Sequence, residues 1–183
     1  SCCGCCCAHA GEQGRGVFPR NEKELQKFGA SWLSKCLTDV GVLTGGVVVS
    51  KVALEDANEG GLLGEMCKVF LEYSGQTDAP RTLMAKFRPP DTETRITTAL
   101  FDLCEHEYDF YRTIQPTAMA GANLRVPKLV YGDYHRRSGT FIMLFEFVHA
   151  TFTTIQTPTP REKSVLVLEK LAGIHSTFWG GAY

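Results

Sequence analysis

The chain has 183 residues, of which 44% are hydrophobic and 21% charged, and its formal net charge is −1. This composition is typical of a globular protein of one domain or slightly more, and it excludes a disordered tail, a collagen-like fibre and a coiled-coil rod. The charge balance lacks the basic excess of a nucleic-acid binder, and no apolar run approaches the ~18 residues of a membrane helix. We therefore expect a soluble protein without a membrane span and without a nucleic-acid partner.

The cysteines are unevenly distributed. Five of the eight lie within the first seven residues, whereas Cys36, Cys67 and Cys104 stand alone in apolar patterns. Secreted disulfide frameworks spread their cysteines along the fold, so we expect a reduced, cytoplasmic protein. Residues 1–20 show no apolar period and no h-region of a secretory signal, which predicts an irregular extension. Three roles stay open for it, namely an inert tail, lipidation of adjacent cysteines, or a metal site on Cys2, Cys5 and His9.

The first half of the chain predicts one helix and three strands. Asn21 precedes Glu24 by the capping-box spacing, and apolar residues from Leu25 to Val40 recur at helical period before Gly41. Strand-like segments follow at residues 46–54, 64–73 and 82–88. The short spacers between them favour antiparallel hairpins.

The second half continues with a long helix, a hairpin and a final helix. Asp91 is the expected cap of a helix to about Ile114, whose apolar stripe is Ile96, Leu100, Leu103, Phe110 and Ile114. Residues 126–134 and 140–148 predict another hairpin. Thr159 is the expected cap of the last helix, and its exposed stripe should include Leu168, Leu171, His175 and Phe178.

Five strands with one helix inserted after the third predict an α+β fold. We divide the chain into an irregular extension (1–20), a main domain (21–148), a linker (149–160) and the beginning of a further helical region (161–183).

Glu107 is the most informative residue, because it lies on the predicted apolar face of the long helix. A carboxylate there is costly unless a cation or several donors meet it. Lys86 likewise places a charge in an otherwise apolar segment, the third strand. An ion pair between Lys86 and Glu107 would account for both positions. The alternative is that both side chains reach the solvent at the edge of their stripes.

A glycine cluster at Gly60, Gly61 and Gly64 lies between the first two strands. Glycines in such a loop allow backbone amides to approach an anion closely. The cluster lacks the pattern of a P-loop and the context of a dinucleotide fingerprint, and it could be an ordinary turn.

These features in this order resemble a kinase N-lobe. The chain is similar, over about residues 32–179, to the aminoglycoside-phosphotransferase-related small-molecule kinases, in particular their ecdysteroid-kinase-like (choline-kinase-like) branch. The matching segments are Gly61-Leu-Leu-Gly64-Glu65, Pro80-Arg81-Thr-Leu-Met-Ala-Lys86, Glu107-x-x-Phe110-Tyr111, Val126-Pro127-Lys-Leu-Val-Tyr131, Phe141-Ile-Met-Leu-Phe145-Glu146 and Leu171-Ala172-x-x-His175-x-x-Phe178-Trp179.

The resemblance implies a fold and roles for single residues. The fold would be a protein-kinase-like N-lobe, a five-stranded antiparallel sheet with a C-helix, followed by the first C-lobe helix. Lys86 would hold the ATP phosphates with Glu107 orienting it, and Gly61 and Gly64 would flank the triphosphate loop. The adenine site would include the side chains of Met143 and Phe145 and the backbone groups of Glu146 and Val148. His175 would be a buried, structural histidine.

The same resemblance implies that no catalytic residue lies in this chain. These kinases carry their catalytic Asp and their Mg²⁺ ligands in the C-lobe, and none of the five histidines here is followed by Asp two residues later. We expect those residues beyond Tyr183, in a full protein that phosphorylates the hydroxyl of a small molecule. Two rivals stay open: a nucleotide-binding pseudokinase, and a Cys-anchored scaffold.

Overall fold

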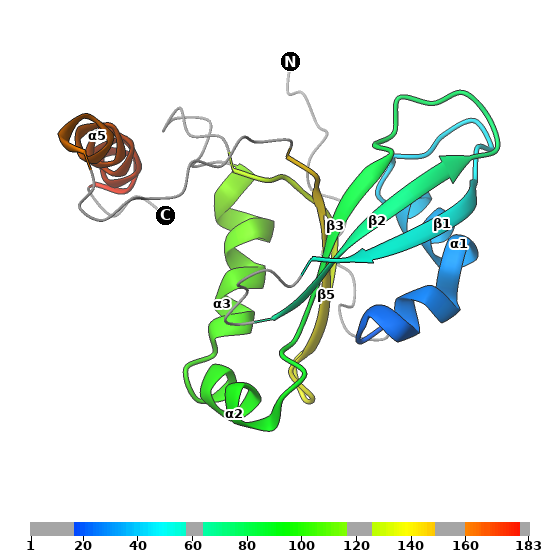
Figure 1. Cartoon of the computed structure of the whole chain (residues 1–183), viewed down its shortest axis with the longest axis horizontal. Coiled ribbons are helices and arrows are strands. Elements are labelled where there is room, and N and C mark those ends of the chain that lie inside the picture. The colour runs from blue at the N-terminus through cyan, green and yellow to red at the C-terminus, as the bar shows by residue number, and fades with distance from the viewer. Residues whose placement is uncertain (1–16, 58–63, 117–125, 149–159, 180–183) are drawn as a thin grey trace, which may run out of the picture.

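The computed structural model describes residues 17–57, 64–116, 126–148 and 160–179 (Figure 1). Its centre is one five-stranded antiparallel sheet in the order β1-β2-β3-β5-β4. The strands are β1 (Val49–Asp56), β2 (Glu65–Tyr73), β3 (Thr82–Phe87), β4 (Leu129–His135) and β5 (Thr140–Glu146). The predicted hairpins and the α+β class are confirmed. Strand β5 inserts between β3 and β4, a placement that strand patterns alone do not specify.

The sheet carries a core on each face, because successive side chains of a strand point to opposite sides. On one face Leu83, Ala85 and Phe87 of β3 pack with residues of β2 and β5 beneath helix α1 (Glu22–Asp39). On the other face Phe141, Met143 and Phe145 of β5 pack against helix α3 (Leu103–Asp109), whose buried residues are Cys104 and Tyr108. Residues 140–145 of β5 are therefore all buried, and β5 has the longest run of buried residues in the sheet.

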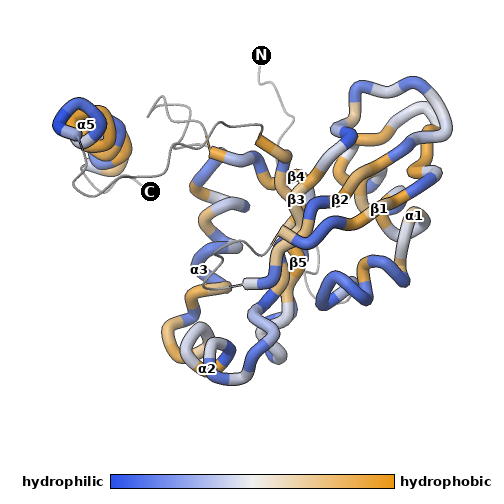
Figure 2. Tube along the Cα trace, in the orientation of Figure 1, coloured by the Kyte–Doolittle hydropathy of each residue, from blue (hydrophilic) through white to orange (hydrophobic). Residues whose placement is uncertain are grey.

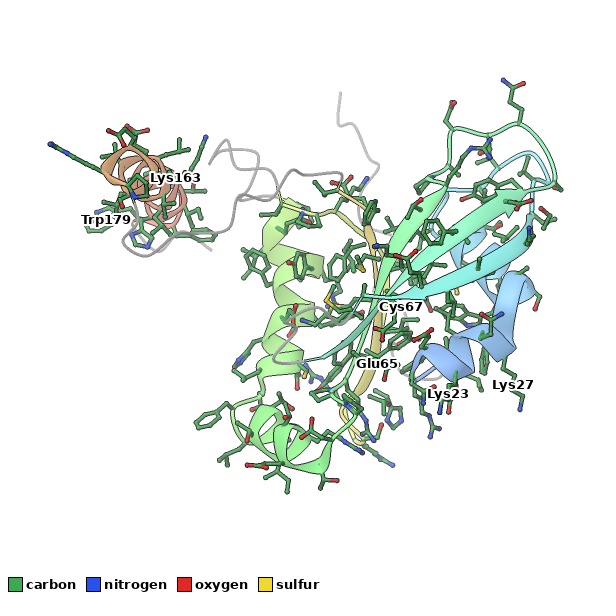
Figure 3. All side chains as sticks on the ribbon, viewed as in Figure 1. Lys23, Lys27, Glu65, Cys67, Lys163 and Trp179 are labelled. Atoms are coloured by element: carbon green, nitrogen blue, oxygen red, sulfur yellow. The ribbon has the colours of Figure 1, made fainter. Side chains whose placement is uncertain are left out.

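Helix α1 begins where the sequence predicts. The Asn21 side chain accepts a hydrogen bond from the Glu24 backbone N–H at 2.9 Å, as expected of an N-cap. A second acceptor comes from the sheet, since Glu65 of β2 accepts from the Glu22 N–H at 3.0 Å. Figure 3 shows Glu65 close to the first turn of α1. The buried apolar stripe of α1 ends before Val40, where the sequence predicted it to end, since Val40 is 44% exposed.

The long helix predicted for residues 91–114 is interrupted. It consists of α2 (Thr92–Leu100), α3 and a π-helical turn η1 (Phe110–Ile114). Asp102 has φ 50°, in the left-handed region, so residues before and after it do not share one helical face. The predicted stripe is wrong for this reason: Ile96, Leu100 and Ile114 are 64%, 74% and 39% exposed.

The extension predicted for residues 1–20 also needs a new boundary. Phe18 is 7% exposed and belongs to the core beneath α1, and Pro19 is fully buried. The Arg20 N–H donates to the Glu24 carboxylate at 2.9 Å. Residues 18–20 therefore belong to the folded domain, because Phe18 is the apolar residue that packs before the helix cap. The Cys2, Cys5 and His9 site lies outside the described residues.

The last helix, α5 (Arg161–Phe178), starts at Arg161 with Pro160 at the cap position; Thr159 lies outside the described residues. None of its residues is buried. Leu168 and Leu171 are 63% and 43% exposed, as expected, and Phe178 is half-buried. Figure 2 colours several stretches of this helix as hydrophobic. No helix in the described part of the chain has both the length and the apolarity to cross a membrane.

Candidate functional site

The candidate site is centred on Lys86, which lies on the α3-facing side of β3. The side chains of its strand neighbours Ala85 and Phe87 point to the core beneath α1, so alternation places the Lys86 side chain on the opposite face, beneath α3. In the sheet it is flanked by Met66 of β2 and Met143 of β5. The lysine side chain is only 16% exposed, so its ammonium needs a partner.

Glu107 of α3 is that partner. The Lys86 ammonium donates to both Glu107 carboxylate oxygens, at 2.6 and 2.7 Å. The predicted ion pair is confirmed, and the alternative in which both side chains reach the solvent is wrong. The apolar stripe from which the position of Glu107 was predicted is only partly correct. Leu103 and Phe110 do not mark the sheet-facing side; Cys104 does, and Glu107 follows it by three residues, nearly one helical turn.

Tyr108 holds α3 in position on the sheet. Its hydroxyl donates to the Gly132 carbonyl of β4 at 3.3 Å. A Cβ atom at Gly132 would lie 2.9 Å from the Tyr108 ring, so only glycine leaves room for this docking. Tyr108 also stacks on Tyr134, with ring centroids 5.7 Å apart. These contacts fix the distance between Glu107 and the strand that carries Lys86.

Gly64 lies against Lys86 from the side of β2. A Cβ atom there would be 2.8 Å from the Phe87 carbonyl oxygen and 2.9 Å from Cε of Lys86. Gly64 therefore permits the lysine side chain to run along the sheet toward Glu107. Gly61, the other glycine assigned to the triphosphate loop, lies outside the described residues.

The predicted adenine wall is only partly accessible. Met143 is fully buried and Phe145 is 5% exposed, both in the core beneath α3. Met143 therefore offers no surface to a ligand in this structure, which corrects its assignment. Two half-buried residues on the same face were missed as candidates, Met84 and Tyr111. Alternation could have identified Met84, which lies two residues before Lys86 on the same strand.

Tyr111 joins the Lys86 site to the end of β5. Its ring packs edge-on against Phe145, with centroids 4.6 Å apart. Burial first, and then the negative charge of Glu107, raise the pKa of its phenol. Tyr111 is therefore neutral at physiological pH and sits beside the Glu107 carboxylate as an uncharged aromatic side chain.

The predicted hinge residues follow β5. The Glu146 N–H donates to the Lys128 carbonyl at 2.9 Å. That amide is therefore occupied by the fold, which removes the Glu146 N–H from the backbone groups expected to contact an adenine. Val148 is half-buried at the end of the described segment.

His175 is exposed on α5, as expected for the stripe that it shares with Leu168 and Leu171. The buried, structural role that the family resemblance implies for it is not seen among the described residues. Among these residues no group of three His, Cys, Asp or Glu side chains is arranged to hold a metal ion.

No family of known proteins matches the chain, and no curated protein matches it. What can be said of the site therefore comes from its own chemistry. It presents a lysine ammonium held by a carboxylate, beside a glycine, on a sheet surface with half-buried methionine and tyrosine side chains. An ammonium in such a position suits phosphate oxygens, with an apolar surface nearby for a flat ring.

Proposed function

We propose that this chain is the ATP-binding lobe of a small-molecule kinase of the ecdysteroid-kinase-like group, whose full protein transfers the γ-phosphoryl of ATP to a substrate hydroxyl. The observation that carries the proposal is the Lys86–Glu107 ion pair at 2.6 Å. A lysine on the third strand paired with a glutamate of the helix that packs on the sheet, here α3, is the phosphate-binding arrangement of kinase-like enzymes. The antiparallel sheet with its inserted helix is compatible with a kinase-like N-lobe.

In this proposal each group has a part in nucleotide binding. An ammonium has three N–H donors, and both Glu107 oxygens lie within hydrogen-bond distance of it. Glu107 thereby holds the ammonium in one orientation and leaves donor capacity for the α- and β-phosphates. The adenine would lie toward Met84 and the Glu146–Val148 backbone. The catalytic Asp and the side chains that hold Mg²⁺ would belong to the C-lobe of the full protein.

Two rival functions make different predictions. A pseudokinase would bind the nucleotide with the same residues and transfer nothing. A Cys-anchored scaffold would use its sheet only for contacts and would bind no nucleotide. Nucleotide binding by this chain therefore separates the scaffold from the other two, and phosphoryl transfer by the full protein separates the kinase from the pseudokinase.

The first experiment measures MgATP binding by isothermal titration calorimetry. We expect Lys86→Ala to weaken binding by about tenfold to a hundredfold, because charge-assisted hydrogen bonds contribute ~1.5–3 kcal/mol. The matched control is Lys51→Ala, since Lys51 also pairs with a glutamate across the sheet, Glu72 at 3.0 Å, but is exposed on the outer strand. Wild-type protein that binds no MgATP, or equal affinities for both variants, would overturn the proposal.

A second variant guards against misfolding. Lys86→Ala leaves the Glu107 carboxylate, whose side chain is 32% exposed, without its cation. The double variant Lys86→Met with Glu107→Gln removes both charges at similar volume. We expect it to unfold at close to the wild-type temperature and to bind MgATP no better than Lys86→Ala. Wild-type affinity in this folded variant would exclude the ion pair from nucleotide binding.

A further inference from the structure

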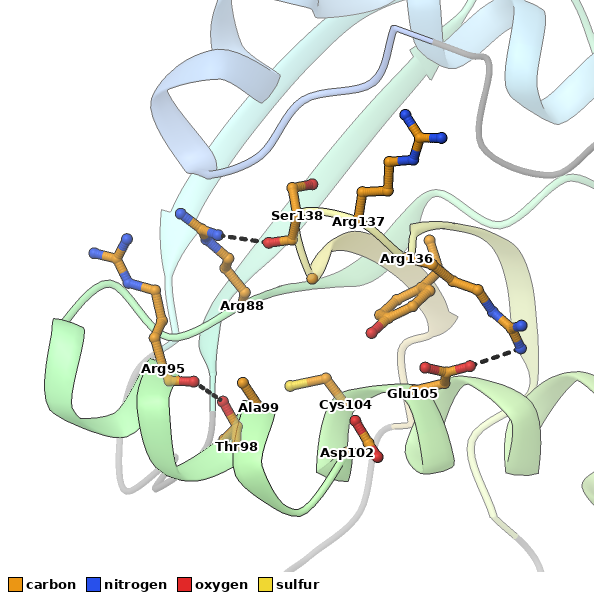
Figure 4. Close-up of a pocket in the computed structure, with 12 residues that line it drawn as sticks. Arg88, Arg95, Thr98, Ala99, Asp102, Cys104, Glu105, Arg136, Arg137 and Ser138 are labelled. Carbon is orange, nitrogen blue, oxygen red and sulfur yellow. Dashed lines mark hydrogen bonds and ion pairs between the residues drawn. The ribbon is translucent and has the colours of Figure 1, made fainter.

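A pocket of about 370 Å³ lies at the opposite end of the α3-facing core from the hinge segment (Figure 4). The end of β3, helix α2, the start of α3 and the β4–β5 turn form its walls. Four arginines line it: Arg88, Arg95, Arg136 and Arg137. The only carboxylates among the lining residues are Asp102 and Glu105, so the pocket carries an excess of positive charge.

One of the four arginines is paired with a carboxylate, and two others are held by backbone carbonyls. Arg136 forms an ion pair with Glu105 at 2.6 Å. Arg88 is held by a carbonyl instead, donating to the Ser138 oxygen at 3.1 Å. Arg95 donates to the carbonyl oxygens of Asp91, at 3.1 Å, and Pro90. Figure 4 shows Arg88 and Arg95 on one side of the pocket, with Arg136 and Glu105 on the other.

The two carbonyl-bound guanidiniums lack a carboxylate partner within the described part of the chain. Two acids lie close to Arg95 in the sequence, Glu93 and Asp91. The Asp91 side chain accepts from the Thr94 N–H at 2.7 Å as the cap of α2, and the charge of Arg95 is a minor cause of its lowered pKa. Burial, then the charges of Arg95 and Arg20, lower the pKa of Arg88. The cations therefore lie close enough to repel one another, and an anion bound between them would relieve that repulsion.

We propose that this pocket binds a phosphate group, free or as a small phosphate monoester. The guanidinium fork matches the oxygens of a phosphate, and carbonyl contacts have left several N–H donors of Arg88 and Arg95 unused. The pocket volume is at the lower end of small-ligand sites, about 300–1,000 Å³. It has room for a phosphate and a small organic substituent.

The pocket is separate from the Lys86 site but built on the same two elements. Arg88 follows Lys86 by two residues, and the lining residue Cys104 precedes Glu107 by three. A phosphate between Arg88 and Arg95 would join the end of β3 to the helix that leads into α3. Occupancy of this pocket would therefore stabilise the arrangement in which Lys86 and Glu107 meet.

The test is calorimetric titration of the full chain with inorganic phosphate and with phosphoethanolamine, at constant ionic strength set by chloride. We expect one site, and a loss of about tenfold or more in affinity for Arg88→Gln and for Arg95→Gln. Arg81→Gln is the matched control, because Arg81 is exposed before β3 and outside the pocket. Binding of both probes would show that the site accepts a monoester, and binding of phosphate alone would identify a site for the free ion.

Three results would overturn the proposal. They are the absence of phosphate binding above the chloride background, unchanged affinity in both arginine variants, and a greater loss of affinity in the Lys86→Met, Glu107→Gln double variant than in either arginine variant, which would place the anion at Lys86. Arg88 also holds the β4–β5 turn through Ser138, so Arg88→Gln could fail to fold. Arg95→Gln and Arg95→Lys then carry the test; the lysine variant keeps the charge but lacks the fork, and we expect intermediate affinity.

Discussion

The replacement of Gly64 by alanine tests the steric argument at the Lys86 site. The added Cβ would lie 2.8 Å from the Phe87 carbonyl oxygen and 2.9 Å from Lys86 Cε. Both distances are well inside van der Waals contact. The lysine end can move, but the Phe87 carbonyl belongs to the backbone of β3, where Phe87 pairs with Glu65 and with Ile142. Relief therefore requires a shift of the sheet itself.

Overpacking of this kind costs about 1–3 kcal/mol. Gly64 does not have a positive φ, so alanine would not be strained by its backbone conformation and the cost is steric. The control is Gly75→Ala, where the new Cβ would meet only Val47 Cγ2 at an ordinary 3.5 Å. A Gly→Ala change at such a compatible position is neutral or stabilising by up to about 1 kcal/mol, through the unfolded state.

The assay is urea unfolding followed by circular dichroism, which gives the free energy of unfolding for both variants. We expect Gly64→Ala to lie at least about 1 kcal/mol below Gly75→Ala. Because the methyl group also displaces Lys86 Cε, MgATP affinity should fall in the same variant if the proposed function holds. Equal stability of the two variants would refute the packing argument whatever the protein binds.

Three further predictions concern the core, a helix cap and the cysteines. Phe18→Ala should lower the free energy of unfolding by about 3 kcal/mol, since Phe18 is buried. The control Val17→Ala, at a residue 79% exposed, should change it by less than about 0.5 kcal/mol. Equal effects of the two substitutions would show that Phe18 does not belong to the folded domain. The Thr94 N–H lowers the pKa of the Asp91 carboxyl below its ordinary 3.8, so the cap stabilises fully above that pH and is lost as the pH falls through the lowered value. Asp91→Ala should therefore reduce the melting temperature at pH 7 and approach wild type in strong acid, and a constant difference across this range would contradict the ionised cap. Burial raises the pKa of two thiols, Cys36 and Cys67, to about 12 and also raises that of Cys104; peptide mapping after iodoacetamide treatment at pH 8 should find all three unmodified until urea is added, and rapid native alkylation of any of them would show that it is accessible.

The elements themselves could be predicted from local chemistry. The Asn21 and Asp91 caps form as expected because a short polar side chain accepts from an amide three residues on, within one helical turn. The hairpins were predictable because a short polar spacer allows two successive strands to pair only in the antiparallel direction. The Lys86–Glu107 contact could also be inferred, since each charge alone would be costly in an apolar element and the chain has few means to compensate both.

Other features depend on packing between distant segments. The helix break at Asp102 leaves Ile96 and Leu100 exposed, and helical periodicity cannot detect it because both halves are helical. The family resemblance placed Met143 in the adenine site, but β5 carries a core on each face, and Met143 is buried in the core beneath α3. The arginine pocket brings Arg88, Arg95 and the β4–β5 turn together across about 50 residues of chain. Local sequence determines caps, turns and periods because these act within a few residues, whereas the face and depth of each side chain are decided only when the sheet and its helices assemble.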